Sequence, residues 1–228
     1  MALPFDTSAL AHRQLQVVLM LDCSGSMRGD RIASVSYALL TALPDLREAA
    51  ADNPEVDVRV RVLAFGSEPR WLTEGAVPVE QLVWPDLQAH GHTAMGGALA
   101  MVAETLSTED TGARQLPPIL VLASDGYPTD DVDAGLRALL ATAEGSAATR
   151  IAIAIGSDAA MTILNRFIAN PAMPPLRAGN AAELAQHIRW ATTAPVKAAS
   201  SPIDVDDPIA ALARTRPMDE PPASDIIW

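Results

Sequence analysis

The sequence contains a single cysteine, Cys23. One cysteine excludes an internal disulfide framework and a zinc site built from several thiolates. Such sparing use of cysteine is typical of proteins in a reducing compartment, so we expect a cytoplasmic protein. The opening residues, MALPFDTSALAHRQ, carry neither the basic nor the apolar region of a secretory signal, which favours the same location.

Basic residues are also few. The chain has 16 Lys and Arg against 28 Asp and Glu, which gives a formal net charge of -12. Binding to the phosphate backbone of a nucleic acid needs a basic face, so we expect no nucleic-acid partner. No apolar run approaches the roughly 18 residues that a membrane span needs, so we expect no membrane partner either.

The chain does contain a regular alternation of short apolar runs and longer segments with helical spacing. Runs rich in Val, Leu and Ile predict strands at residues 14–21, 56–65, 119–123 and 150–155. Helices are predicted at residues 31–46, 94–106, 132–143, 159–169 and 181–192. This order predicts an α/β fold with a doubly wound, mostly parallel central sheet flanked by helices. The hairpin-like stretch GSEPRWLTEGAVPVEQ favours one antiparallel edge strand.

Composition divides the chain into three parts. Residues 1–13 form an N-terminal lead, residues 14–194 the α/β domain, and residues 195–228 a tail rich in proline and acidic residues. Its prolines and Asp-Pro steps break long elements, which favours a flexible tail. The segment IAALA can nevertheless form a short helix, and the apolar end IIW is costly to leave in water. Both features favour a tail that docks on this domain or on a partner.

Polar side chains gather where the carboxyl ends of parallel strands are expected to meet. Asp22, Ser24 and Ser26 follow the first strand in DCSGSM, Thr93 lies in the loop HGHTAMGG, and Asp125 closes ILVLASD. Ligands of doubly wound sheets collect at this edge. Two carboxylates and three hydroxyls are hard oxygen donors, which suit Mg²⁺, with Mn²⁺ or Ca²⁺ as alternatives. The sequence therefore predicts a metal site there.

The motif DCSGSM, with the distant Thr93 and the later SDGYPTD, resembles the metal-ion-dependent adhesion site (MIDAS) of von Willebrand factor A (VWA) domains. The pattern of that site is D-x-S-x-S, a distant Thr and a distant Asp. By this resemblance Ser24 and Ser26 bind Mg²⁺ directly and Thr93 binds it directly or through water. Asp22 and Asp125 act mainly through water.

The resemblance, which covers about residues 15 to 193, implies recognition rather than catalysis. With its carboxylates held away from the metal, such a site keeps one coordination position open. An Asp or Glu of a protein partner can fill that position. We therefore expect a Mg²⁺-dependent protein-binding module, a scaffold or regulatory subunit, and not an enzyme.

More narrowly, SGSMRGDRI and DGYPTDD resemble the bacterial TerY-like cytoplasmic VWA proteins of tellurite-resistance and stress-response gene clusters. Those clusters imply a protein kinase or a PP2C-type phosphatase as partner. Ser124 departs from the Thr that is frequent before the Asp, but it leaves the ligand set intact. The alternative is a VWA subunit that works with an AAA+ ATPase of the MoxR or chelatase type. The chain lacks the P-loop pattern G-x-x-x-x-G-K-[ST], so ATP hydrolysis would belong to that partner.

An enzymatic alternative is a haloacid-dehalogenase-like phosphatase, with Asp22 as nucleophile and Asp125 holding Mg²⁺. This chemistry needs a second carboxylate two positions after the nucleophile as general acid, and Ser24 stands there. No lysine follows in the expected region either. We expect phosphatase activity to be absent.

Other reactive side chains have plainer explanations. Cys23 has no base fixed beside it, so burial is favoured over a nucleophilic role. His90 and His92 flank the predicted site and could be metal ligands or a pH switch, but polar loop residues are the favoured interpretation. Trp71 and Trp84 could be interface anchors or core contacts.

Thr129 or Asp130 is expected to cap the helix that follows them, rather than to extend an acidic rim.

In the tail, one of three acidic residues could fill the open metal position of its own or a neighbouring molecule, which would make the tail autoinhibitory. These residues are Asp204, Asp206 and Asp207.

Overall fold

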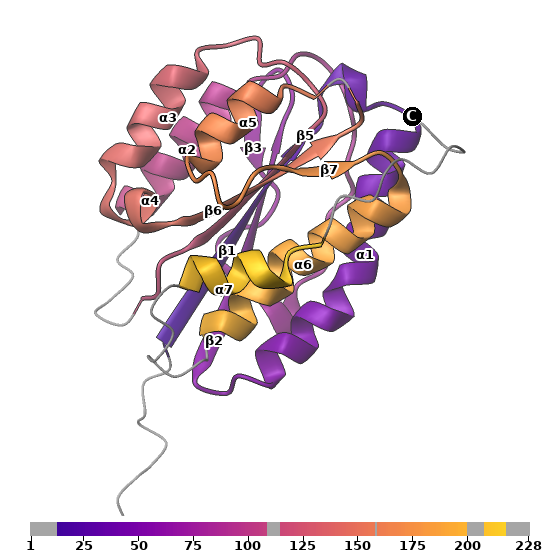
Figure 1. Ribbon diagram of the computed structural model, residues 1–228. Helices are drawn as coiled ribbons and strands as arrows, with labels where there is room; N and C mark the ends of the chain where they lie inside the picture. The colour runs from indigo at the N-terminus through magenta and orange to yellow at the C-terminus, as the bar shows by residue number, and fades with distance from the viewer. Residues whose placement is uncertain (1–12, 109–114, 158, 200–207, 218–228) are drawn as a thin grey trace, which may run out of the picture.

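The computed structural model describes residues 13–108, 115–157, 159–199 and 208–217, which are built around one sheet (Figure 1). Its parallel strands are β1 (Arg13–Asp22), β2 (Val56–Phe65), β5 (Ile119–Ser124), β6 (Thr149–Ile155) and β7 (Leu176–Ala178). Two short strands, β3 (Pro69–Trp71) and β4 (Val77–Pro78), pair antiparallel with β2. The predicted doubly wound, mostly parallel α/β fold with an antiparallel edge is confirmed.

The order of the strands is β3-β2-β1-β5-β6-β7, with β4 also on β2. From β1 the chain adds β2 on one side and β5, β6 and β7 on the other, so the winding direction reverses between β1 and β5. Ligands of doubly wound sheets bind outside the carboxyl ends of the strands at such a switch point. Both β1 and β5 are buried on both faces from Val17 and Ile119 onward, which explains their unbroken apolar sequences.

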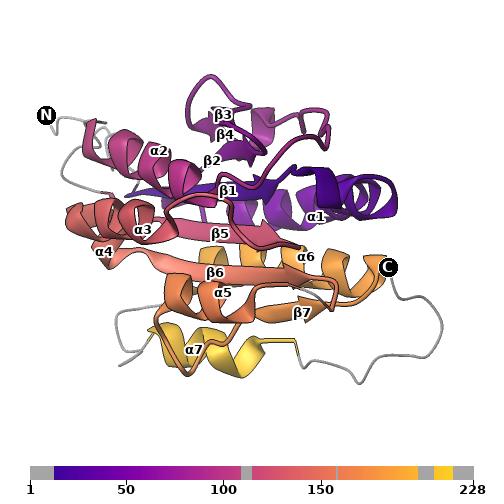
Figure 2. The ribbon, with the colours of Figure 1, turned by 90° about the horizontal axis from the view of Figure 1, so that it is seen from above.

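Helices cover both faces of the sheet. Figures 1 and 2 show α1, α6 and α7 on one face and α2, α3, α4 and α5 on the other. Their bounds are α1 (Asp30–Ala51), α2 (Met95–Thr108), α3 (Val132–Ala141), α4 (Ala143–Ala147), α5 (Met161–Ile168), α6 (Ala181–Ala199) and α7 (Pro208–Thr215). Two short 3₁₀ turns, η2 (Gly25–Met27) and η3 (Val79–Gln81), complete the described elements.

Several elements differ from the sequence prediction; α1, for example, extends beyond the predicted end at residue 46 to Ala51. The helix expected at residues 132–143 is divided in two, because the Thr142 side chain accepts a hydrogen bond from Gly145 N and caps α4. The last predicted helix continues through Pro195 to Ala199, so this proline does not end the element. Strand β7, only three residues long, was not predicted, because so short a run shows no periodicity.

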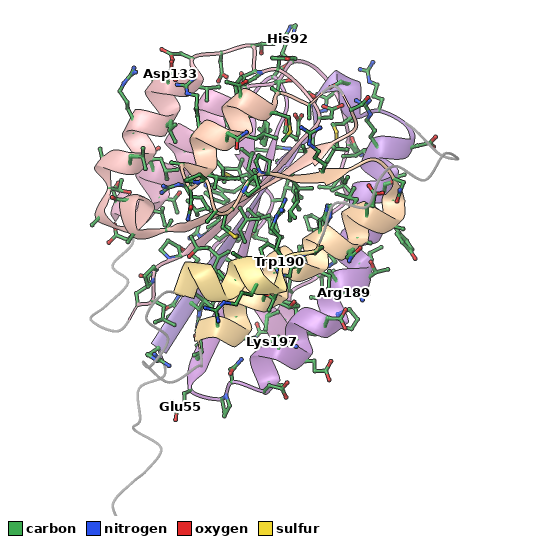
Figure 3. The ribbon with its side chains drawn as sticks, viewed as in Figure 1. Glu55, His92, Asp133, Arg189, Trp190 and Lys197 are labelled. Carbon is green, nitrogen blue, oxygen red and sulfur yellow. The ribbon has the colours of Figure 1, made fainter. Side chains whose placement is uncertain are left out.

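The short helix predicted at IAALA is confirmed as α7. It packs against α6: Leu212 is buried, and Trp190 of α6, labelled in Figure 3, donates a hydrogen bond of 3.2 Å from Nε1 to Thr215 Oγ1. Arg216 Nη2 also donates to Pro175 O, at 3.2 Å. The apolar end IIW and the three tail aspartates lie outside the described residues. Among the residues that are described, no helix is long and apolar enough to cross a membrane.

Candidate metal centre

The five predicted ligands are assembled from two adjacent strand ends and one loop. Strands β1 and β5 are neighbours in register, with Leu21 opposite Ala123. Asp22 therefore ends β1 beside Ser124, the last residue of β5. The Ser124 hydroxyl donates a hydrogen bond of 2.6 Å to Asp22 Oδ2. This contact ties the two strand ends together at the switch point.

The turn after β1 folds back over the Asp22 carboxylate. Ser24 N donates to Asp22 Oδ1 at 2.8 Å, and the chain then enters η2. The hydroxyls of Ser24 and Ser26 lie 2.9 Å apart. Ser26 Oγ donates to Asp125 Oδ1 at 2.8 Å, which links the turn to the residue that follows β5. Hydrogen bonds thus connect four of the five predicted ligands in one chain.

Thr93 joins this cluster from the loop before α2. Its backbone is paired with Thr129: Thr93 N donates to Thr129 Oγ1 at 3.2 Å, and Thr129 N donates to Thr93 O at 2.9 Å. A Cβ placed on Gly126 would lie 3.6 Å from Ser26 Oγ and 3.9 Å from Thr93 Oγ1. The two hydroxyls therefore face the same small space, and the fold brings all five predicted residues together.

Both carboxylates of the cluster are removed from solvent. Asp22 and Asp125 are each only 1% exposed. Burial raises the pKa of Asp22 above its ordinary value, hydrogen bonds from Ser124 and Ser24 offset part of this rise, and the nearby charge of Asp125 adds to it. An ionised Asp22 is thus held in a place that disfavours its negative charge, and a cation there would relieve that cost.

Arg31 is a charged neighbour of the site that sequence analysis missed. Its Nη1 lies 2.5 Å from Asp125 Oδ2, so one oxygen of Asp125 binds a guanidinium and the other accepts from Ser26. Arg31 stands in the first turn of α1, where the helix begins beside the end of β5. In the sequence Arg31 is only a basic residue a few positions after DCSGSM, and nothing in that position indicates that it pairs with Asp125.

The donor set fits a hard cation. Within the described ranges no group of three or more His, Cys, Asp and Glu residues converges, so a cation here would depend on hydroxyl oxygens as well as on the two carboxylates. Oxygen donors without sulfur or imidazole suit Mg²⁺, which keeps several water ligands. The exposed Ser26 places the cluster at the surface, where a further ligand can reach it.

Glycines allow three loops to pack closely around the site. Gly25 N donates to Gly91 O at 3.0 Å, and a Cβ on Gly25 would lie 3.1 Å from that oxygen. A Cβ on Gly66 would lie 2.7 Å from His90 O. Gly91 itself has φ +75°, a conformation that favours glycine. The turn after β1, the turn after β2 and the loop before α2 therefore pack as one layer.

The two histidines do not join the ligand cluster. Both are exposed loop residues; His90 Nδ1 lies 3.3 Å from Gln88 O, and the backbone N of His92 donates to Ser67 Oγ at 3.1 Å. Their arrangement agrees with the favoured interpretation of polar residues near the rim.

The expected helix cap was assigned to the wrong residue. The N-cap of α3 is Asp131, whose side chain accepts from Ala134 N at 2.9 Å. Asp130 instead accepts two hydrogen bonds from the first turn of α2, and Thr129 holds the Thr93 backbone. The sequence DD offers two equivalent caps, and only the position of α2 distinguishes them.

Cys23 and the two tryptophans have structural surroundings. Cys23 is 3% exposed, and burial raises the pKa of its thiol to about 12. Trp71 and Trp84 are half-buried and pack against the core. The Arg61 guanidinium lies 5.2 Å from the ring centre of Trp71. Core packing thus accounts for both tryptophans as they stand.

A doubly wound sheet with a cluster of carboxylate and hydroxyl oxygens at its switch point defines a class of α/β domains suited to bind a ligand at the strand ends. Within that class, the chain belongs to the von Willebrand factor type A domain family, whose sequence model matches residues 16–188. Domains of this family often mediate protein–protein interactions, and homologues can bind a metal at the MIDAS. No curated protein matches the sequence significantly.

Solved structures share the fold at low sequence identity. A von Willebrand factor type A protein from Catenulispora acidiphila is 19% identical with a TM-score of 0.61, over 82% of this chain and 43% of that one. The open conformation of the pilus adhesin SpaC from Lactobacillus rhamnosus GG is 15% identical with a TM-score of 0.63, over 83% and 31%.

A third similar structure is proximal thread matrix protein 1 from the mussel byssus, solved with a zinc-occupied MIDAS motif. It is 12% identical with a TM-score of 0.54, over 82% of this chain and 46% of that one. The chain thus spans less than half the length of each of these three proteins.

Proposed function

We propose that this protein is a Mg²⁺-dependent recognition module that binds an Asp or Glu side chain of a protein partner. The observation that carries the proposal is the convergence of two buried carboxylates and three hydroxyls at the switch point of the sheet. A bound ion would supply a positive centre that attracts a partner carboxylate. Ser24, Ser26 and Thr93 would hold it with their hydroxyls.

The two aspartates would act by orientation and charge. Asp22 holds the Ser24 backbone, and Asp125 accepts from the Ser26 hydroxyl, so each fixes a serine in place. Because Arg31 already neutralises one oxygen of Asp125, the site retains only part of its negative charge. A cation held this way attracts a further carboxylate more strongly than one whose charge is cancelled by direct carboxylate ligands.

The wider role that we propose is a cytoplasmic scaffold or regulatory subunit without turnover of its own. The TerY-like segments support a bacterial stress system of the tellurite-resistance type, with a kinase or a PP2C phosphatase as partner. A subunit that works with an AAA+ ATPase is the alternative. The SpaC structure is that of an adhesin and the byssus protein carries zinc in its MIDAS, which supports metal-mediated recognition. A phosphatase remains disfavoured, because Ser24 stands where that chemistry needs an acid.

Metal binding can be measured without knowledge of the partner. Mn²⁺ serves as the probe, because free Mn²⁺ gives an electron paramagnetic resonance signal that is lost on binding. We expect one Mn²⁺ site that Mg²⁺ displaces, and at least tenfold weaker binding in the double variant Ser24→Ala, Ser26→Ala. The matched control is Ser107→Ala with Ser146→Ala, two exposed serines on other elements. Equal binding by both double variants would contradict the proposed site.

The partner is sought by pull-down from native lysate, read by mass spectrometry. The samples are wild type in Mg²⁺, wild type in EDTA, and the double variant in Mg²⁺. Proteins retained only by the first sample are metal-dependent partners and identify the pathway. Proteins retained equally by all three would move the interface away from the metal centre.

A further inference from the structure

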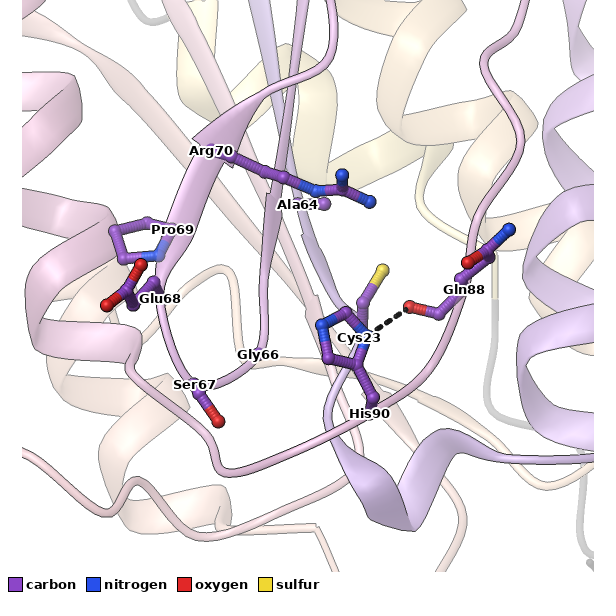
Figure 4. Close-up of a pocket in the computed structure, with 9 residues that line it drawn as sticks. All are labelled: Cys23, Ala64, Gly66, Ser67, Glu68, Pro69, Arg70, Gln88 and His90. Carbon is purple, nitrogen blue, oxygen red and sulfur yellow. Dashed lines mark hydrogen bonds between the residues drawn. The ribbon is translucent and has the colours of Figure 1, made fainter.

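A cavity opens beside the candidate metal centre, on the other side of the turn that follows β1. Its volume is about 230 Å³, and its floor is formed by Cys23, Ala64 and Gly66. Figure 4 shows Arg70 reaching over this floor from β3, with Gln88 and His90 on the opposite wall. Pockets for small molecules measure about 300–1,000 Å³, so this cavity is of a size for one side chain.

The cavity and the metal centre share one wall, which is the backbone of the turn. Asp22 and Ser24 direct their side chains into the metal centre, whereas Cys23 between them lines the cavity. His90 N donates to Cys23 O at 2.8 Å and holds the far wall in place. Strands β1 and β2 are parallel and adjacent, so both sites lie at the same edge of the sheet. A single partner segment can therefore cover both.

The chemistry of the cavity favours an anion. Arg70 is exposed and forms no hydrogen bond or ion pair within the described ranges, so its guanidinium is available. The Cys23 side chain below it is buried. Figure 4 shows the Glu68 carboxylate beside Pro69, turned away from the Arg70 guanidinium. A guanidinium binds a carboxylate through two parallel hydrogen bonds, which makes a carboxylate the best-matched occupant.

We propose that this cavity is a second subsite that takes another acidic side chain of the same partner, with Arg70 as its specificity-determining residue. The inference rests on the proposed function, because it supposes a first acidic side chain at the metal. The recognised segment would carry two acidic residues close in sequence. An acidic partner suits this corner of an otherwise acidic chain, because Arg70 lines the cavity and Arg28 donates to Ala89 O beside it.

The test is a peptide selection on the whole chain. A phage-displayed library of random peptides is bound to immobilised wild type in Mg²⁺, and bound phage are eluted with EDTA. We expect the eluted peptides to be enriched in segments with two Asp or Glu residues. The same selection on Arg70→Gln should yield metal-dependent peptides with one enriched acidic position. The matched control is Arg177→Gln, an exposed arginine of the edge strand β7, which should select the same peptides as wild type.

A double-mutant cycle then assigns the contact. The best selected peptide and its variant with Gln at the second acidic position are titrated by fluorescence anisotropy against wild type and Arg70→Gln. On wild type we expect that change in the peptide to weaken binding about five- to tenfold. The two peptides should bind Arg70→Gln equally, because this variant lacks the guanidinium that distinguishes an acidic side chain from Gln. Equal unfolding midpoints confirm that Arg70→Gln is folded.

Two failures have different meanings. If EDTA elutes no enriched peptide, both the metal-dependent recognition and the second subsite are overturned. If EDTA elutes peptides with a single acidic position, and Arg70→Gln binds them as wild type does, the second subsite is overturned while the proposed function stands.

Discussion

Asp22 and Asp125 are the residues on which the candidate site depends, and each is restrained from two directions. Asp22 accepts from the Ser24 backbone and the Ser124 hydroxyl, while Asp125 binds Arg31 and Ser26. Buried carboxylates are stable only with such partners. Only Asp125 has a cationic partner, which leaves the charge of Asp22 without direct neutralisation among these contacts.

The substitution Asp22→Asn should raise the stability of the metal-free protein at neutral pH, because it removes a buried negative charge. The raised pKa of Asp22 means that the folded state holds its proton more tightly than the unfolded chain does. Ionisation therefore costs stability: the cost is absent below the ordinary value of 3.8 and grows as the pH rises through the higher folded-state pKa. The free energy of unfolding in EDTA, compared at pH 7 and pH 4, measures the effect.

The gain from this substitution should be smaller at pH 4 than at pH 7. Asp86→Asn, which removes an exposed carboxylate, is the control and should show no such difference. A loss of stability at pH 7 would show that the ionised Asp22 is stabilised even without a metal. Because the carboxylate is gone, Mg²⁺ should no longer stabilise the variant.

The Cys23 thiol should be almost inert in the native protein. With a pKa of about 12 it is protonated at pH 8, and only the thiolate reacts. We expect its reaction with Ellman's reagent to be about a thousandfold slower than that of the same thiol in guanidinium chloride. Because the chain has one cysteine, the absorbance change reports this residue alone. Native and unfolded rates of equal size would contradict both the burial and the raised pKa.

At the scale of elements, the contact between α2 and α3 positions one side of the site. The loop that carries Thr93 leads into α2, and Asp130 before α3 binds the first turn of α2. A Cβ on Gly96 would lie 2.3 Å from Asp131 O, and one on Gly135 would lie 2.2 Å from Gly96 O. The two helices therefore approach through a glycine from each, and larger side chains would separate them.

Gly96→Ala should lower the free energy of unfolding by about 2 kcal/mol, because the backbone of the next loop must move. The neighbouring Gly97→Ala is a matched control, since its Cβ would lie no nearer than 3.5 Å to any other group. That change should be neutral or stabilise the protein by up to about 1 kcal/mol through helix propensity. Urea unfolding of the two variants gives both values. Equal changes in the free energy of unfolding for Gly96→Ala and Gly97→Ala would mean that the contact between α2 and α3 does not require a glycine at position 96.

For the whole molecule, a net charge of -12 attracts cations in general, so specific and general effects of Mg²⁺ must be separated. General attraction weakens as salt rises, because ions screen exposed charges. The candidate centre, with its buried carboxylates, should be screened less. Stabilisation by Mg²⁺ that persists at physiological ionic strength can therefore be assigned to binding at the candidate centre.

Mg²⁺ at ten times its dissociation constant should stabilise the folded protein by about 1.4 kcal/mol. For a chain of this size the unfolding midpoint should rise by about 3–5 °C. Differential scanning fluorimetry in 0.15 M salt, with EDTA as reference, measures the shift. The double variant Ser24→Ala, Ser26→Ala should show no shift. A shift of the same size in that variant would assign the stabilisation to general charge.

The class of the fold and the candidate ligands could be predicted from the sequence. Strands buried on both faces must be apolar throughout, so β1, β5 and β6 are visible as unbroken runs. Ligands of a doubly wound sheet gather at strand ends, so polar residues directly after those runs identify a candidate site before any contact is known. Of the candidates, Asp22 and Asp125 come directly at strand ends and needed no knowledge of the tertiary structure to be named.

Tertiary structure alone decided the contacts between distant segments. The pairing of Arg31 with Asp125 and the cavity under Arg70 depend on where α1 and β3 lie relative to neighbouring strands. The choice of Asp131 over Asp130 as helix cap depends on the position of α2. Local sequence sets periodicity and turn chemistry, but it carries no information about which side chain lies across a sheet edge. For that reason the candidate residues could be named from the sequence, whereas the charged side chain that pairs with Asp125 could not.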